Sequence, residues 1–314
     1  MNRFSDFMLP PAKSTLAGET DALFHFINVT SVILLAGITI AIIYFSWKYR
    51  RRSENDVTPV ITHNSKLEIA WSVIPLILVM IVFGWGFTGY TNLANAPDDA
   101  YEIRVVGKSW LWEFHYRNGT VSVNELHVPV NRPVKLVMSS DDVIHSLYIP
   151  DFRVKRDVLP NRYTSVWFEA TETGENIIYC TEYCGTAHSN MLANTIVHSQ
   201  EDFETWLETS GADMDDDMDP AERGEMLITQ NACNACHSVD GTRMVGPSFQ
   251  GLWMSERTMQ DGEVVTADEN YIRESILEPN ARITQGYNAV MPSFSGTLDD
   301  RQIDAIIEYI KTLE

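Results

Sequence analysis

Residues 176–191 read NIIYCTEYCGTAHSNM, a short β-branched and aromatic run followed by a loop rich in metal-binding side chains. The loop offers two cysteines, a histidine and a methionine: Cys180, Cys184, His188 and Met191. His145 lies upstream, in SSDDVIHSLYIP, between two other predicted strands. Single-copper electron-transfer sites use one cysteine, two histidines and a weak axial methionine. The stretch therefore predicts a copper-binding β domain that has one cysteine more than a single copper ion needs.

The additional thiolate has a use, because two cysteine sulfurs can bridge two copper ions that each bind one imidazole. Met191 and a main-chain carbonyl would then be weak outer ligands, and sharing one electron across the pair limits rearrangement on electron transfer. A structural zinc site is an alternative, but zinc does not use a thioether ligand. A Cys180–Cys184 disulfide is another, but it would leave His145, His188 and Met191 without a role. The residues favour the copper pair over both.

The sequence around this loop has strand character from about residue 101 to residue 197. Short segments such as YEIRVVG, SWLWEFHY, PVKLVMSS and YTSVWFEA are separated by Gly, Pro, Asn and Asp. This pattern is typical of an antiparallel β sandwich or barrel. We expect this domain to span residues 95–208, with a short closing helix at EDFETWLETS.

Two apolar runs precede the β domain, at about residues 22–47 and 69–90. Each is long enough to cross a hydrocarbon core of about 30 Å as a helix. KYRRRS follows the first run directly, and the excess of basic residues predicts a cytoplasmic connection. Residues 1–94 are therefore expected to form an N-terminal segment and a transmembrane hairpin. The later domains would lie outside, in a compartment that suits copper insertion.

The C-terminal part begins after an acidic stretch, residues 209–219, which is predicted to be a self-repelling linker. Residues 220–314 have helical periodicity at both ends and contain NACNACHSVDG. Its C-x-x-C-H motif is typical of covalent haem attachment, with thioethers at Cys233 and Cys236 and iron ligation by His237. A thioredoxin-like pair would instead need a βαβ setting.

A second axial ligand to the haem iron is expected from a later loop. Met291, just before the last predicted helix, is the best candidate, with Met244 and Met254 as alternatives. Five histidines lack neighbours suited to metal binding and are interpreted as ordinary structural residues: His25, His63, His115, His127 and His198.

The chain resembles cytochrome c oxidase subunit II over about residues 20–208, through LEIAWSVIP, GKSWLWEFHY, DVIHS and the C-x3-C-x3-H-x2-M loop. The resemblance implies a cupredoxin-like domain that holds the dinuclear copper centre CuA. The implied ligands are His145, Cys180, Cys184, His188, Met191 and the main-chain carbonyl of Glu182. The Glu182 carboxylate would bind a Mg²⁺ shared with subunit I, although a solvated loop acid is the alternative.

Two further roles follow from the resemblance. Glu68 matches a glutamate near a proton pathway of the partner subunit, but it also suits a helix N-terminus. Trp110 matches a tryptophan associated with electron entry, although this chain has GKSW where many relatives have GHQW. From about residue 222 to residue 314 the chain resembles class I cytochromes c, in which a proline at the position of Pro247 orients the axial histidine.

Composition limits the partners. The formal net charge is −20 and the pI about 4.7, which excludes a nucleic-acid-binding surface. The acidity is explained by a solvated surface, or by a landing site for a basic redox donor.

The expected protein is a multidomain membrane protein with a two-helix transmembrane hairpin, an all-β cupredoxin-like sandwich and an all-α class I cytochrome c domain. Its resemblance implies electron transfer from an external donor such as a cytochrome c, through haem c and CuA, to oxidase subunit I, with subunit III as a further partner. Oxygen reduction and proton translocation would occur in subunit I, in a bacterial inner membrane. A CuA-bearing subunit of a nitric-oxide reductase is the alternative, and a quinol-oxidase-type subunit is disfavoured because every copper ligand position is filled.

Overall fold

The structure is a computed structural model that describes residues 8–56, 60, 62–210 and 218–313. The chain divides into two compact units, residues 16–95 and the remainder. Most of the acidic linker expected at 209–219 lies outside the described residues.

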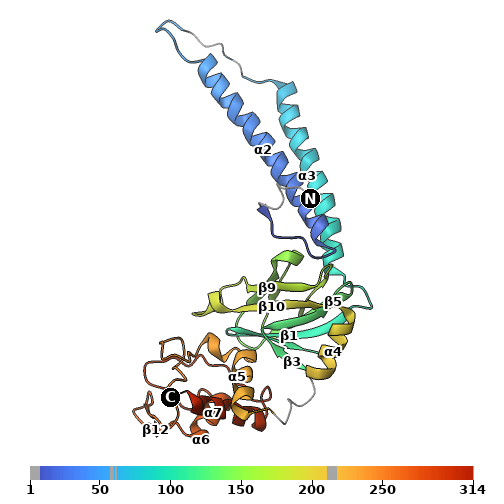
Figure 1. The fold of residues 1–314 in the computed structure, drawn as a ribbon. Helices are drawn as coiled ribbons and strands as arrows, with labels where there is room; N and C mark the ends of the chain where they lie inside the picture. The colour runs from blue at the N-terminus through green and yellow to red at the C-terminus, as the bar shows by residue number, and fades with distance from the viewer. Residues whose placement is uncertain (1–7, 57–59, 61, 211–217, 314) are drawn as a thin grey trace. The chain divides into compact units, whose positions relative to one another are not determined.

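The smaller unit is a pair of long helices, α2 (Ala17–Lys48) and α3 (Ser65–Ala94), which form an antiparallel hairpin (Figure 1). Both are longer than the apolar runs by about a turn at the N-terminal end. Both have the length and mean hydropathy of membrane spans, 2.4 and 2.3, and their apolar side chains face outward. The ring of Phe26 lies 5.8 Å from that of Trp85, which joins the two helices.

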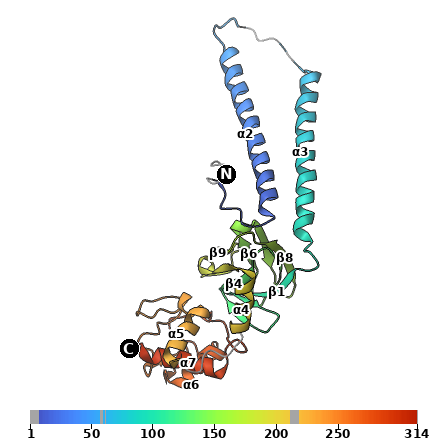
Figure 2. The same ribbon diagram turned by 45° about the vertical axis from the view of Figure 1, so that its right-hand side comes forward.

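A β sandwich of two five-stranded sheets forms the first part of the larger unit, as far as the described residues show (Figures 1 and 2). In sheet order, the first sheet is β3 (Val121–Val123), β2 (Leu111–His115), β1 (Tyr101–Lys108), β5 (Pro133–Ser140) and β8 (Thr164–Glu169). The second is β4 (Glu125–Pro129), β10 (Leu192–His198), β9 (Gly174–Cys180), β6 (His145–Ile149) and β7 (Val154–Val158). The pairs β1–β5 and β4–β10 are parallel, and the other pairs are antiparallel.

The sandwich core follows from alternation along the strands, because successive side chains point to opposite faces. In β5, burial alternates residue by residue, with Val134, Leu136 and Met138 fully buried. Trp112 and Phe114 of β2 are also fully buried. Helix α4 (Gln200–Ser210) closes the domain where the sequence predicted a helix.

The C-terminal domain is built from three helices, α5 (Pro220–Gln230), α6 (Glu269–Leu277) and α7 (Asp300–Thr312), with α5 packed on α7. Gly224 permits this packing, because a Cβ there would lie 2.0 Å from the carbonyl oxygen of Ala305. The middle stretch, for which the sequence made no prediction, contains a small hairpin of β11 (Glu256–Thr258) and β12 (Val264–Thr266). The expected fold class is confirmed: two apolar helices, a β sandwich and a helical C-terminal domain.

Candidate metal centre and cofactor cavity

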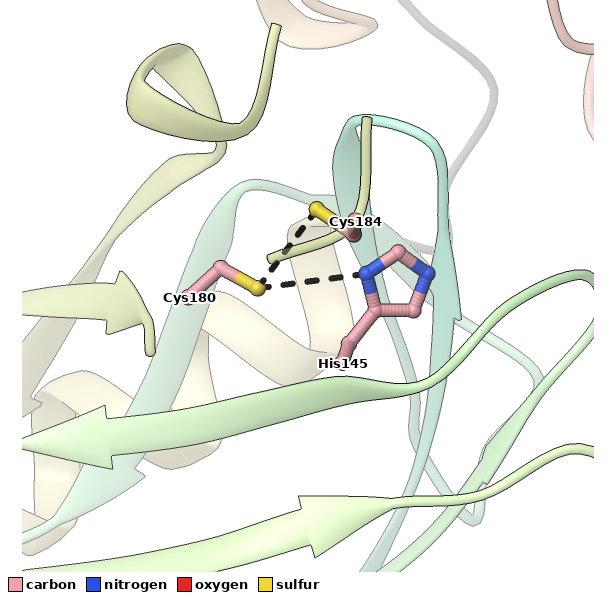
Figure 3. Close-up of side chains that lie close together, drawn as sticks. All are labelled: His145, Cys180 and Cys184. Carbon is pink, nitrogen blue, oxygen red and sulfur yellow. Dashed lines mark hydrogen bonds between the residues drawn. The ribbon is translucent and has the colours of Figure 1, made fainter. Parts of the chain in front are cut away.

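The predicted copper ligands come from two places in the second sheet. His145 is the first residue of β6, and Cys180 is the last residue of β9. The loop between β9 and β10 supplies the others and contains a short 3-10 turn, His188–Asn190. Because β6 and β9 are paired, the histidine and the first cysteine meet at the same end of the sheet (Figure 3).

The side chains converge on one point. The Sγ atoms of Cys180 and Cys184 are 3.7 Å apart, and His145 Nδ1 is 3.9 Å from Cys180 Sγ. His188 Nδ1 is 3.4 Å from Cys184 Sγ, and Met191 Sδ is 3.7 Å from it. The ligand atoms of His145, Cys180 and Cys184 all lie within 4.8 Å of one another.

The chemistry of this donor set fits a copper pair. Each sulfur has one imidazole nitrogen beside it, and the buried Met191 thioether approaches one side. On the other side, the carbonyl oxygen of Glu182 lies 3.3 Å from Cys180 Sγ. Soft thiolate and thioether donors with imidazole select copper over hard cations. Both cysteines are free thiols, so the disulfide alternative is not formed in this structure.

The environment also favours a thiolate. Burial raises the pKa of Cys180, but hydrogen bonds, first from His145, outweigh it and lower the pKa to about 7. The pKa of Cys184 is raised to about 12 by burial and by the charge of Cys180. Cys180 is therefore the cysteine that loses its proton more readily, and a metal ion bound by both sulfurs would displace the proton of Cys184.

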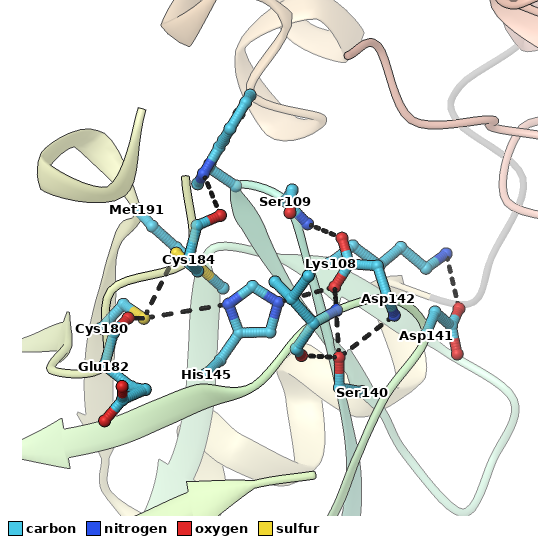
Figure 4. Close-up of polar contacts among 12 residues, drawn as sticks. Lys108, Ser109, Ser140, Asp141, Asp142, His145, Cys180, Glu182, Cys184 and Met191 are labelled. Carbon is cyan, nitrogen blue, oxygen red and sulfur yellow. Dashed lines mark hydrogen bonds and ion pairs between the residues drawn. The ribbon is translucent and has the colours of Figure 1, made fainter. Parts of the chain in front are cut away.

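Asp142 was not singled out in the sequence, but it orients the predicted ligand His145 (Figure 4). Its Oδ1 lies 2.8 Å from Nε2 of His145, on the opposite side of the ring from Cys180. Its Oδ2 accepts a hydrogen bond of 2.7 Å from the main-chain nitrogen of Ser109. Hydrogen bonds of this kind fix the tautomer and direction of metal-binding histidines. The available signal was an aspartate three residues before His145.

The carboxylate of Glu182 is exposed, next to Tyr183, whose side chain is 77% exposed. Glu68 has a local structural role, since its carboxylate accepts a hydrogen bond of 2.9 Å from the main-chain nitrogen of Asn64 at the start of α3. This contact accounts for a glutamate in the first turn of the helix.

The C-x-x-C-H motif lines a cavity in the C-terminal domain. Cys233, Cys236, His237 and Met291 all contribute to its wall. Met244 and Met254 are not among the lining residues, and the side chain of Met254 is 57% exposed.

The hydrogen bonding and packing of His237 suit a ligand to iron. Its Nδ1 donates a hydrogen bond of 2.7 Å to the carbonyl oxygen of Pro247, which leaves Nε2 for a metal. Burial lowers the pKa of His237 and so favours the neutral ring that a metal requires. The ring is stacked on Phe249 at 4.7 Å, and a Cβ on Gly246 would lie 2.6 Å from Cε1 of the imidazole.

Trp110 contacts both the loop that contains Cys184 and the cavity that contains the C-x-x-C-H motif. Its Nε1 donates a hydrogen bond of 3.0 Å to the carbonyl oxygen of Cys184. Ser109, Trp110 and Leu111 also line the cavity that contains the C-x-x-C-H motif. Leu111 is buried, and it belongs with Val123 to the apolar cluster of the helical domain.

Known protein families match three successive parts of the chain. Residues 3–87 match the transmembrane domain of cytochrome c oxidase subunit II, residues 90–199 match its periplasmic domain, and residues 221–314 match cytochrome c. Cytochrome c oxidase subunit 2 of Alkalihalophilus pseudofirmus is 30% identical over 300 residues, covering 91% of this chain and 86% of the relative. The protein of the same name from Cereibacter sphaeroides is 27% identical, covering 63% and 78%. The solved periplasmic domain of subunit II of Bradyrhizobium japonicum cytochrome oxidase is 30% identical, with a TM-score of 0.36, and the match covers 37% of this chain and 96% of that one.

Proposed function

The chain belongs to the cytochrome c oxidase subunit II family and carries a C-terminal cytochrome c domain, and on this basis we propose that it relays electrons through two of its own cofactors. Electrons enter at a haem c attached to Cys233 and Cys236. They pass to a dinuclear CuA centre and then to subunit I, where oxygen is reduced to water with proton translocation. The haem-copper oxidase is thus the enzyme, and this chain is its electron-transfer subunit.

The copper pair would be held by six groups that the fold brings together: His145, Cys180, the carbonyl of Glu182, Cys184, His188 and Met191. When bound, the copper pair would accept and pass on one electron with little change in its surroundings. The residues contribute by rigidity: His145 and Met191 are fully buried, so their rotamers are fixed by packing. The haem iron would be held between His237 and Met291, which line the same cavity.

The observation that carries the proposed route is the position of Trp110. One indole lines the cavity around the haem-attachment motif and donates a hydrogen bond to a residue of the copper loop. A Cβ on Gly185 would meet the indole Cζ2 at 3.0 Å, so the ring lies directly against the loop. An electron leaving the haem would therefore cross one aromatic side chain before reaching the cysteine sulfurs.

The proposed contacts with other subunits and with an electron donor are those that membership of the family implies. The exposed Glu182 carboxylate is available to bind Mg²⁺ at the interface with subunit I. Subunit III and an external donor such as a cytochrome c are the other proposed partners, and Glu68 would lie near a proton pathway of subunit I. The two spans indicate a membrane protein. We assign the sandwich and the cytochrome c domain to the outer side of a bacterial inner membrane, because the connection between the spans carries Arg50, Arg51 and Arg52.

The test is to purify the complex from its native membrane and measure copper, covalent haem and turnover. The proposal predicts a copper pair for each haem c in this chain, and reduction of oxygen. Absence of copper from fully matured complex would overturn it, and turnover of nitric oxide in place of oxygen would assign the chain to a nitric-oxide reductase.

The route is tested separately by Trp110→Phe, which keeps an aromatic ring but removes the hydrogen bond to Cys184. Haem-to-copper electron transfer, followed optically after rapid reduction, should slow while the copper signal stays unchanged. An unchanged rate would exclude the hydrogen bond from Trp110 to Cys184 as part of the route.

A further inference from the structure

The imidazole of His145 lies against the backbone of β1. A Cβ added to Gly107 would be 3.0 Å from Cδ2 of His145, 3.5 Å from its Cγ and 3.3 Å from Cζ3 of Trp112. Contacts of 3.0–3.4 Å are tighter than nine in ten real Cβ contacts, so the neighbouring ring would have to move. The three heavy atoms nearest to this Cβ therefore all belong to the side chains of His145 and Trp112.

Backbone conformation does not explain a glycine here. Gly107 is not among the residues with positive φ, and it lies within a regular strand, paired with Trp112 and Ser140. Glycine in a strand interior weakens the strand and often marks a site of close approach. The close approach at Gly107 is that of the His145 ring.

Trp112 is the second residue against the His145 ring. We call the space between Gly107 and Trp112 that receives this ring the slot. Trp112 is fully buried, and its ring lies 5.9 Å from that of His145 at an interplanar angle of 66°. Its indole N–H has no hydrogen-bond partner among the described residues, although burying an unsatisfied donor is unfavourable. A phenylalanine would avoid this cost, so the size of the indole ring accounts for the tryptophan better than its polarity does.

The slot leaves the ring one open edge. Asp142 holds Nε2 at 2.8 Å, while Gly107 and Trp112 bound the side that carries Cδ2. The remaining edge presents Nδ1 toward Cys180 Sγ (Figure 3). The tilt of the imidazole is therefore determined by its packing before any metal binds.

We propose that Gly107 is a positioning residue of the copper centre: its bare Cα, together with Trp112, sets the tilt of the His145 ring. The inference rests on the proposed copper pair. Two copper ions share an electron evenly only when their surroundings are balanced, and rotating one imidazole changes the field at one ion alone. A side chain at position 107 would therefore make the two ions unequal without removing any ligand.

The test compares four variants of the whole complex: two single changes in the slot, their double variant and a control. The main measurement is the electron paramagnetic resonance spectrum of the oxidised copper pair. Gly107→Ala narrows the slot, and Trp112→Phe widens it without breaking a hydrogen bond. Val105→Ala is the control, because Val105 is fully buried on the same face of the same strand but lies two residues away.

Gly107→Ala should lose the hyperfine pattern of two equivalent copper nuclei while keeping the copper-to-haem ratio and the haem spectrum of the parent. Trp112→Phe should broaden the pattern, and the double variant should return toward the parent because one change offsets the other in volume. Val105→Ala should give the parent pattern.

Parent spectra from both single variants would overturn the inference while leaving the copper centre in place. If Gly107→Ala does not accumulate, Trp112→Phe decides in the same way: a changed pattern supports the slot and an unchanged one refutes it. A parent complex without paired copper would instead refute the proposed function, and the inference with it.

Discussion

Replacing Asp142 with asparagine tests how far a residue that binds no metal controls the copper centre. The carboxylate accepts hydrogen bonds at both oxygens. Oδ1 accepts from His145 Nε2, from the Val143 main-chain nitrogen and from Ser140 Oγ, and Oδ2 accepts from the Ser109 main-chain nitrogen. Burial opposes its charge, but hydrogen bonds from His145, Ser109 and Val143 hold its pKa well below the usual range. The residue therefore acts as an anion.

Asparagine keeps the shape but has only one acceptor oxygen. The amide oxygen will take the Oδ1 position, where three donors meet, so the NH₂ group faces the Ser109 main-chain nitrogen and that hydrogen bond is lost. His145 keeps an acceptor, but a neutral amide accepts more weakly than a carboxylate does. Mutation of an outer-shell partner of a ligand histidine typically lowers metal affinity about 10- to 100-fold, or about 1.4–2.8 kcal/mol. We expect a loss in this range for copper.

The assay is retention of copper by the purified complex against a chelator of known affinity, with the haem spectrum as an internal reference. Asp141→Asn is the matched control, since Asp141 is 56% exposed and contacts only Lys108 among the ion pairs described, at 3.7 Å. A surface pair of this kind contributes about 0–1 kcal/mol. Equal copper retention by the two variants would refute the role of Asp142.

Three other predictions follow from the site and its surroundings. Cys180→Ser should abolish the paired-copper paramagnetic signal and leave the haem spectrum intact, whereas loss of both would show that the two domains are not independent. Met291→Ala should leave the haem attached but change its axial ligation, and an unchanged optical spectrum would exclude Met291 as the ligand. The pKa of His198 is lowered by burial and by the adjacent His127, so the folded state binds this proton more weakly than the unfolded chain does. Stability should therefore fall as the pH drops below about 6.5, and thermal unfolding of His198→Gln should depend less on pH in that range.

The sequence alone was sufficient to predict those features whose residues lie close together in the chain. Two apolar runs determine the hairpin, and residues 180–191 supply most of the proposed copper ligands from one continuous loop. Cys233, Cys236 and His237 are adjacent enough that their spacing alone indicates haem attachment. Each of these patterns depends on neighbours in the chain, so no knowledge of strand pairing was needed.

The supporting residues could not be predicted, because their roles depend on strand register. Gly107 meets the His145 ring only after β1 has packed across the sandwich from β6. His127 and His198 were interpreted as ordinary structural residues. Their Nδ1 and Nε2 atoms, respectively, lie 2.8 Å apart because β4 and β10 pair in parallel, and no short stretch of sequence predicts that pairing. The ring of Trp206 in α4 stacks on that of His127 at a centroid distance of 4.0 Å. Predicting this contact would have required the position of α4 against the sheet.

Two of the three histidines proposed as metal ligands, His145 for copper and His237 for iron, are held in place by the same physical means, although they lie in unrelated folds. Each has its second nitrogen held by an acceptor and its ring pressed against a glycine, Gly107 for His145 and Gly246 for His237. The acceptors differ, because His145 faces a carboxylate and His237 faces a carbonyl. A carboxylate makes its imidazole a stronger donor to the metal than a carbonyl does. Rings fixed in this way cannot swing when the metal changes its charge, and a centre that only relays electrons benefits from that rigidity because little of its surroundings has to rearrange at each transfer.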